Sequence, residues 1–227
     1  FEFCCENNDE ILSKWARHFR NHYCLDSEID ALRDGTGYSR SQYLKEFKLP
    51  TRSQGLGPSI RAGDFGEILV ADYLEYILGY WVPRTRYDSK TIRDESTKGS
   101  DLIGFKFVGN GESPYDILSI FEVKTQFSGD TPKSRLQDAI NDSIKDEIRK
   151  GESLNAIKQR LFDKQRLDEV KKIARFQNPI DKPYKEIDGA AALFSTNLYD
   201  KKTIISTTVN GHPGKDNLML VVIRGND

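Results

Sequence analysis

The sequence predicts a mixed α/β fold in which helices pack on one mixed central sheet. Apolar residues recur at helical spacing in several segments, and short runs of β-branched and aromatic residues lie between them. Two of these runs flank a tight-turn signal, which adds an antiparallel pair to the sheet. A chain of 227 residues, 37% of them hydrophobic, is long enough to bury a sizeable core.

Helices are expected where the 3.6-residue periodicity is clear. The segments are 9–25, 27–34, 40–47, 64–78, 134–150 and 153–175. Gly79 ends the fourth helix and Gly151 separates the last two, because glycine disfavours a helix interior. The apolar rows slip in phase between Leu161 and Leu167, which predicts a kink in the last helix.

Strands are expected at runs rich in β-branched and aromatic residues. The segments are 80–87, 101–108, 115–126, 189–196, 203–209 and 217–223. Residues 88–99 are polar and are expected to be loop. We expect residues 1–60 to form a helical and loop-rich N-terminal extension, and residues 61–227 to form the core domain.

The turn signal Asn110-Gly111 predicts the register of the two middle strands. In an antiparallel pair the numbers of opposed residues add to a constant, which is 223 for a turn centred after Gly111. This register pairs Asp101 with Glu122, Ile103 with Ile120, and Phe105 with Leu118. Alternation along the second strand then places Glu122, Lys124 and Gln126 on one face.

Two directly opposed carboxylates repel, so Asp101 and Glu122 call for a cation between them. Mg²⁺ or Mn²⁺ is expected, because hard divalent ions take oxygen ligands, and the carbonyl of Val123 is a further candidate ligand. Lys124 adds a positive charge that would stabilise a phosphate or an attacking water. The set suits phosphodiester hydrolysis. The alternative is a solvent-facing strand end with an ordinary Glu-Lys neighbour pair.

Glu67 is a third candidate acid, on the helix that precedes these strands. Its helix row is otherwise apolar, with Val70, Ala71, Leu74 and Leu78. A carboxylate in a buried row is costly unless it is paired or bound to metal, which favours a metal ligand. The spacing Asp64-x-x-Glu67 is also typical of a helix capping box, so both interpretations remain open.

These residues resemble the PD-(D/E)xK nuclease superfamily. The expected order of elements over residues 60–200 is similar to its restriction-endonuclease-like αβββαβ core. The resemblance implies a metal-dependent DNA nuclease with the active-site residues Glu67, Asp101, Glu122 and Lys124. It gives Gln126 a supporting role, and Ser100 stands where the motif has its proline. Two alternatives are a junction-resolving or repair nuclease, and a DNA-binding module that does not cut.

Three stretches are also similar to the nuclease subunit of the Hachiman anti-phage defence system. They are Gly63-Asp64-Phe65-Gly66-Glu67, Lys98-Gly99-Ser100-Asp101-Leu102 and Phe121-Glu122-Val123-Lys124-Thr125. This resemblance implies a DNA-degrading effector in a heteromeric complex with a superfamily 2 helicase. The sequence contains no glycine-rich phosphate-binding loop, so any use of ATP would belong to the partner.

Charge is unevenly distributed along the chain, although its net value is −1. Residues 1–34 hold eight acids and four bases, a local charge of −4, which suits a docking or blocking element. Residues 133–185 hold fourteen bases and nine acids, a local charge of +5. The basic stretch is either a nucleic-acid face or a solvated helix surface.

The three cysteines favour a reducing cytoplasm over a disulfide framework. No apolar run approaches the roughly 20 residues of a membrane span, and the first ten residues do not resemble a signal peptide. A zinc site is an alternative use of Cys4, Cys5, His18, His22 and Cys24. The absence of a CxxC pair weighs against it.

Overall fold

The computed structural model describes residues 1–4, 6–109 and 111–225. Cys5 and Asn110, which belong to the zinc and turn predictions, lie outside these residues. The chain forms two compact units. Unit 1 comprises Phe1–Cys4, Gly66–Pro83 and Gly99–Asp227, and unit 2 comprises Cys5–Phe65 and Arg84–Lys98. The domain boundary expected at residue 60 stays a prediction.

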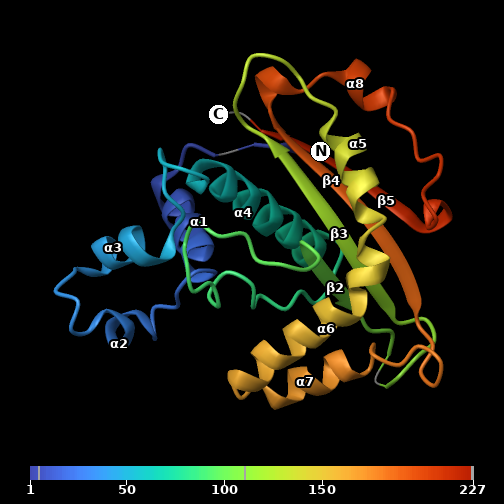
Figure 1. Ribbon diagram of the computed structural model, residues 1–227, viewed down its shortest axis with the longest axis horizontal. Coiled ribbons are helices and arrows are strands. Elements are labelled where there is room, and N and C mark those ends of the chain that lie inside the picture. Colours follow the sequence, from blue (N-terminus) through green and yellow to red (C-terminus); the bar gives the residue numbers. More distant parts are fainter. Residues whose placement is uncertain (5, 110, 226–227) are drawn as a thin grey trace. The chain divides into compact units, whose positions relative to one another are not determined.

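A five-stranded sheet forms the centre of unit 1 (Figure 1). Its strands are β1 (Glu2–Phe3), β2 (Leu102–Lys106), β3 (Ile117–Gln126), β4 (Lys185–Ser195) and β5 (Leu218–Gly225). They lie in the order β1-β5-β4-β3-β2, in which β2 is antiparallel to β3 and the other pairs are parallel. The mixed sheet and the mixed α/β class are therefore confirmed.

The hairpin register is confirmed as well. Leu102 lies opposite Phe121, Ile103 opposite Ile120, and Phe105 opposite Leu118. A slip of one residue would have moved every side chain of one strand to the other face. The apolar pairs of both strands specify this register, and they fix where the charged end of β3 lies.

One face of the sheet is covered by the part of α4 (Gly57–Asp72) that belongs to unit 1. Gly66 lets the helix approach closely, because a Cβ there would lie 2.3 Å from Cγ2 of Thr125. Val70 and Leu74 join the core that Phe121 forms on this face. The chain continues as a π-helical turn η2 (Tyr73–Ile77) and turns at the predicted Gly79, whose φ is +70°.

The opposite face of the sheet is covered by three helices that follow β3. α5 (Arg135–Ser143) packs its Ala139 and Ile140 on Ala190 and Ala192 of β4. α6 (Asp146–Asp163) and α7 (Leu167–Ala174) pack on β2 and β3. Because side chains alternate along β3, Glu122 projects to the same face as Leu118 and Ile120, which contact this second helical layer.

Unit 2 is built mainly from short helical segments. They are α1 (Asp9–Asn21), α2 (Ile29–Arg33), α3 (Arg40–Tyr43), the π-helical turn η1 (Leu44–Lys48) and the start of α4. A small core contains Cys24, Ile29, Tyr43 and Leu44. A buried ion pair adds to it: Lys90 Nζ lies 2.6 Å from Asp64 Oδ2, which also accepts a hydrogen bond from the Tyr23 hydroxyl.

Two predicted strands are wrong. Residues 80–87 contribute only an isolated bridge between Trp81 and Phe105, because Pro83 has no N–H to donate and the following residues belong to unit 2. Residues 203–209 do not form a strand. Lys201–Ile205 form helix α8 instead, with Asp200 accepting hydrogen bonds from the backbone of its first turn.

The helix boundaries also differ from the prediction. α4 begins at Gly57, seven residues early, with Pro58 in its first turn, where proline is favoured. Gly151 lies inside α6, and the chain breaks instead after α5 and again at Gln165, which has a φ of +58°. The second break falls where the phase slip predicted a kink. Two further turns are η3 (Thr196–Leu198) and η4 (Lys215–Asn217).

Among the described helices, none combines the length and the apolar composition that crossing a bilayer requires.

Candidate active site

The β2–β3 hairpin brings the two predicted acids together. Asp101 immediately precedes β2, and its Oδ2 accepts a hydrogen bond from the backbone N–H of Val123 at 3.0 Å. Glu122 is only 7% exposed. Burial, followed by the negative charge of Asp101, raises the pKa of Glu122 to about 7. The sequence therefore places two mutually destabilising carboxylates at one end of the hairpin.

Lys124 lies between two carboxylates on the same side of β3. Its Nζ is 2.6 Å from Oε1 of Glu122 and 2.8 Å from Oδ2 of Asp142 on α5. Burial lowers the pKa of Lys124, but hydrogen bonds to Asp142 and Glu122 outweigh this and raise the pKa above its ordinary value. Lys124 is therefore a fixed positive charge at neutral pH rather than a base.

Asp146, at the start of α6, is a third acid of this site that the sequence prediction missed. It is 1% exposed, and neither carboxylate oxygen has a hydrogen-bond donor in good geometry among the described residues. Burial raises its pKa to about 6; the Ser100 hydroxyl opposes this shift, whereas the charge of Asp101 adds to it. A buried carboxylate with unsatisfied oxygens is the state that a cation relieves.

A signal for Asp146 was present in the sequence. On a helix through residues 134–150, Ala139, Ser143 and Asp146 lie on one face at intervals of four and three residues. An acid on the buried face of a helix is the same observation that singled out Glu67.

Ser100 explains why this chain departs from the proline of the motif. Its backbone N–H donates a hydrogen bond to Oγ of Ser153 on α6 at 3.1 Å, and the two hydroxyl oxygens lie 3.2 Å apart. Proline has no N–H and could not make the first bond. Ser100 thus ties the strand start that carries Asp101 to the helix that carries Asp146.

Glu67 is buried in α4, next to the close contact of Gly66 with Thr125. The capping alternative is wrong, because α4 begins at Gly57 and Asp64 pairs with Lys90 inside the helix. Participation of Glu67 in metal binding stays a prediction. The same holds for the carbonyl of Val123.

Gln126 has a structural role at the end of β3. Its Nε2 donates to the carbonyl of Thr131 at 2.8 Å, and its Oε1 accepts from the backbone N–H of Lys133 at 2.9 Å. These two bonds close the loop that leads into α5. Gln126 therefore helps to position Asp142, which in turn holds Lys124.

The donor set fits a hard divalent cation. Asp101, Glu122 and Asp146 offer oxygen ligands, and the charge of Asp101 raises the pKa of both Glu122 and Asp146. Among the described residues these acids do not form a set of three ligand atoms within 4.8 Å of one another. An ion here would therefore take one or two of them directly and complete its shell with water and phosphate, as Mg²⁺ commonly does.

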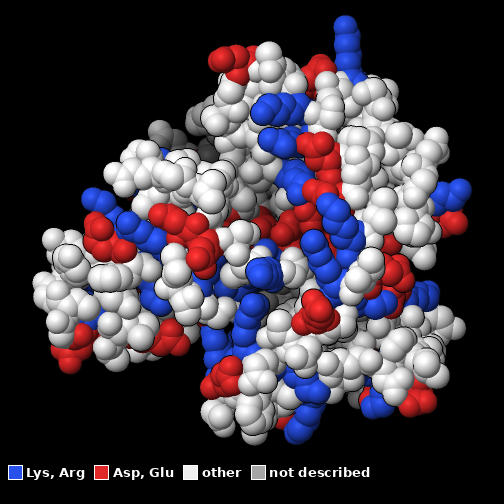
Figure 2. All heavy atoms as spheres, in the orientation of Figure 1, with Lys and Arg blue, Asp and Glu red and all other residues white. Residues whose placement is uncertain are grey.

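The basic stretch 133–185 is largely compensated by acids. Lys145 pairs with Asp142, and Lys150 pairs with Glu186. The surface in Figure 2 shows Lys and Arg side chains interspersed with Asp and Glu. These pairs favour the solvated-surface interpretation of this stretch over a uniform nucleic-acid face.

Part of the alternative zinc set comes together in unit 2. Nε2 of His22 lies 3.4 Å from Nε2 of His18, one helical turn away. Burial, followed by the charges of Arg84 and His18, lowers the pKa of His22 to about 3, so this ring is neutral. Cys24 donates its thiol to the Leu25 carbonyl and, among the described residues, does not join the histidines in a ligand-sized group.

Comparison with known proteins identifies the family. No curated protein matches the chain. A family model described as HamA matches residues 1–227, the whole length of the chain. The chain therefore belongs to the HamA family, a component of the multi-component Hachiman anti-phage defence system.

Proposed function

We propose that this chain is a metal-dependent DNA nuclease and the DNA-degrading effector of its Hachiman system. The observation that carries the proposal is a cluster of three carboxylates, the buried Glu122 and Asp146 and the half-buried Asp101, beside the protonated Lys124. Such a group is costly in a purely structural role and is suited to a phosphodiester and its divalent ion.

The proposed ion is Mg²⁺ or Mn²⁺, held directly by one or two of the three carboxylates, with Glu67 and the carbonyl of Val123 as further candidate ligands. When bound, it supplies Lewis-acid activation of the phosphate and of the attacking water. Lys124 stabilises the negative charge that accumulates on the phosphate oxygens as the bond to the leaving oxygen breaks. Asp142 and Gln126 keep Lys124 in place, the first by direct contact and the second through the loop before α5.

The proposed partner is a superfamily 2 helicase that acts with this chain in the cytoplasm. Membership of a multi-component defence system supports a partner. A nuclease that is always active would damage its own cell, so the partner would restrain cleavage until DNA is engaged. The acidic stretch 1–34 is the candidate docking element, because its local charge suits a basic surface.

The test is cleavage by the purified protein, alone and with its co-expressed genomic neighbour. Plasmid, linear duplex, single-stranded DNA and a four-way junction are incubated with Mg²⁺. We expect Glu122→Ala and Lys124→Ala to abolish cleavage in proteins that remain folded, whereas Lys171→Ala, an exposed lysine of α7, should cut normally.

Each alternative has its own result. Cleavage confined to the junction would favour a junction-resolving nuclease. Tight DNA binding without cleavage under every condition would favour a non-cutting module. Undiminished cleavage by either active-site variant would remove the proposed site.

A further inference from the structure

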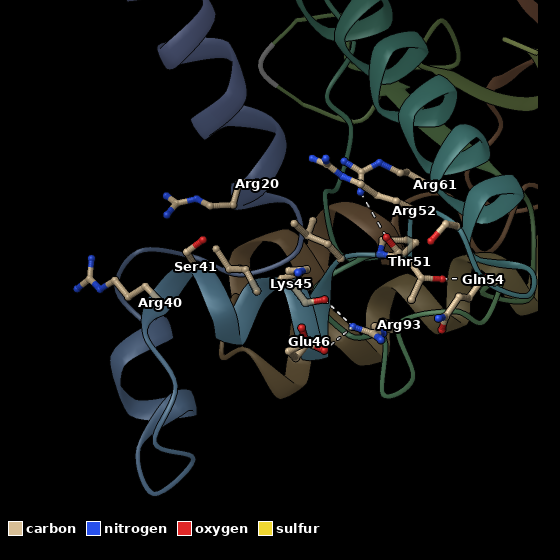
Figure 3. A pocket seen from close by; sticks show the side chains of 14 residues that line it. Arg20, Arg40, Ser41, Lys45, Glu46, Thr51, Arg52, Gln54, Arg61 and Arg93 are labelled. Carbon is tan, nitrogen blue, oxygen red and sulfur yellow. Dashed lines mark hydrogen bonds and ion pairs between the residues drawn. The ribbon is translucent and has the colours of Figure 1, made fainter.

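Unit 2 contains a cavity of about 940 Å³ whose walls are strongly basic (Figure 3). The cations that line it are Arg20, Arg40, Lys45, Arg52, Arg61 and Arg93. Glu46 is the only acid among the described lining residues. Six cations against one acid give the lining a charge of +5 in a chain whose net charge is −1. The fold therefore concentrates positive charge at this place.

These cations come from segments that are distant in the sequence. Arg20 lies on α1, Arg40 on α3, Lys45 on η1 and Arg61 on α4, while Arg52 and Arg93 lie on loops. In Figure 3 the side chains of Arg52 and Arg61 extend in the same direction. Like charges gathered around one cavity repel, and a bound anion relieves that cost.

Among the described residues, three of these six cations have carboxylate partners. The paired ones are Arg20 with Asp26, Arg40 with Asp30, and Arg93 with Glu46. Lys45 and Arg52 form no side-chain hydrogen bond or ion pair within the part of the chain that the structure describes. Arg61 donates to the backbone carbonyl of Pro50 at 3.3 Å. Three positive charges are therefore available to an anion from outside.

The loop that presents Arg52 is held in place. The backbone N–H of Thr51 donates to Oδ1 of Asp94 at 2.8 Å, and its hydroxyl lies 2.9 Å from the carbonyl oxygen of Gln54. The chain folds back so tightly that a Cβ at Gly57 would lie 1.8 Å from Oγ1 of Thr51. A preformed loop spares a ligand the cost of ordering it, which is typical of a binding site.

The lining also limits what the ligand can be. None of the described residues that line the cavity is aromatic, so the lining offers no platform on which a base could stack. The volume is at the upper end of the roughly 300–1,000 Å³ of ligand pockets, which leaves room for more than one phosphate. Arginine forks and a lysine suit phosphate oxygens.

We propose that this cavity is a phosphate-binding site for the backbone of a nucleic-acid strand, read without regard to base sequence. The proposal rests on the proposed nuclease function for the identity of the strand. A free nucleotide is the other source of the same phosphate chemistry. The site is separate from the carboxylate group of unit 1 and would hold DNA rather than cut it.

The experiment measures binding of a 5′-labelled single-stranded oligonucleotide in excess EDTA, so that cleavage does not interfere. Lys45→Ala/Arg52→Ala removes two exposed, unpaired cations and is not expected to disturb folding. We expect this variant to lose at least tenfold in affinity. A plot of the logarithm of the binding constant against the logarithm of the salt concentration should also be less steep by about 1.4, or about 0.7 for each lost phosphate contact. Arg17→Ala, an exposed arginine of α1 outside the cavity, is the matched control and should stay within twofold.

Competition distinguishes the possible ligands. If a mononucleotide displaces the oligonucleotide, and if its own binding requires Lys45 and Arg52, the phosphate site would be assigned to a free nucleotide. Equal binding by wild type and Lys45→Ala/Arg52→Ala would overturn the proposal. Preferential binding of an acidic peptide such as polyglutamate would also overturn it, in favour of a protein partner.

The outcome is independent of whether the chain cuts DNA. Glu112→Gln, at an exposed carboxylate that belongs to neither site, should retain the wild-type affinity for the oligonucleotide in EDTA. Binding that depends on Lys45 and Arg52 in a protein that never cleaves DNA would refute the nuclease proposal alone. If Lys45→Ala/Arg52→Ala binds the oligonucleotide and cleaves DNA as well as the wild type does, the phosphate-site proposal alone would be refuted.

Discussion

Replacing Glu122 by glutamine should stabilise the metal-free protein at pH 8. The carboxylate is buried beside Asp101, and its pKa is raised from 4.5 to about 7. At 1.36 kcal/mol for each pH unit, this difference corresponds to roughly 3 kcal/mol against the ionised form. Glutamine has nearly the same shape and does not carry the charge.

The effect should depend on pH in a defined direction. Because the pKa is higher in the folded than in the unfolded protein, the folded protein binds more protons between pH 4.5 and about 7. The cost of ionising Glu122 is therefore fully present above pH 7 and disappears as the pH falls to 4.5. The advantage of Glu122→Gln should be greatest at pH 8 and small at pH 4.5.

Urea unfolding of both proteins in EDTA measures this difference. A second series in Mg²⁺ should remove most of this difference, since an ion that binds only the folded state stabilises it by RT ln(1 + [L]/Kd), about 2.7 kcal/mol at 100 times Kd. The wild type should gain this stabilisation and Glu122→Gln should lose most of it.

Glu112→Gln is the matched control for these measurements. Glu112 is an exposed carboxylate paired with Lys182, so its replacement should change stability by less than about 0.5 kcal/mol. A Glu122→Gln variant that is less stable than wild type at pH 8 in EDTA would refute the reasoning. So would equal stabilisation of the two proteins by Mg²⁺.

Four further predictions follow from the same contacts. Lys124→Ala should lower the initial rate of DNA cleavage by about 100-fold or more in a protein that circular dichroism shows to be folded, and a rate within twofold of wild type would contradict its role. Mg²⁺ or Mn²⁺ should support cleavage, whereas the larger Ca²⁺ should bind without supporting turnover. Cleavage in excess EDTA would contradict the dependence on a divalent ion. Lys90→Met should lower the free energy of unfolding in urea by about 3 kcal/mol or more, because it leaves Asp64 buried without its cation. A smaller loss in Lys90→Met/Asp64→Asn would confirm that the unpaired carboxylate is the cause. The chain should co-elute with its co-expressed helicase in size exclusion; a chain that stays alone and cuts equally well would be a free-standing nuclease.

The hairpin was predictable from the sequence because its two strands carry matching apolar patterns. A turn centred after Gly111 gives Ile103 and Phe105 apolar partners, and that register fixes the positions of Asp101 and Glu122. The turn position together with these apolar pairs is therefore sufficient to predict the register, although both faces of β3 are buried under helices. The same logic explains why the mixed sheet was predicted correctly.

Other parts of the fold were not accessible to local patterns. The β-branched run Thr203-Ile204-Ile205 is typical of a strand, yet capping by Asp200 and its tertiary setting make it a helix. The sequence predicts a helix end at Gly151, although in α6 this glycine is exposed and costs only about 1 kcal/mol relative to alanine. Intrinsic preferences of this size are readily overridden by packing.

The tertiary parts of the sites were hidden for a related reason. Asp146 and Lys124 reach one place only because α5 and α6 pack on the same sheet face as Glu122. The basic cavity is formed by residues between Arg20 and Arg93, and no short segment of the chain carries its pattern. Such arrangements depend on the fold and have no local signal in the sequence.

The most direct test of the account is the rate of plasmid cleavage by Asp146→Asn in Mg²⁺, with and without the helicase partner. This substitution keeps the shape of the buried side chain and removes the charge that we assign to metal binding. The account predicts a loss of at least about 100-fold in rate, together with a melting temperature in EDTA that is equal to or above that of the wild type. Cleavage at the wild-type rate by a well-folded Asp146→Asn protein would contradict it.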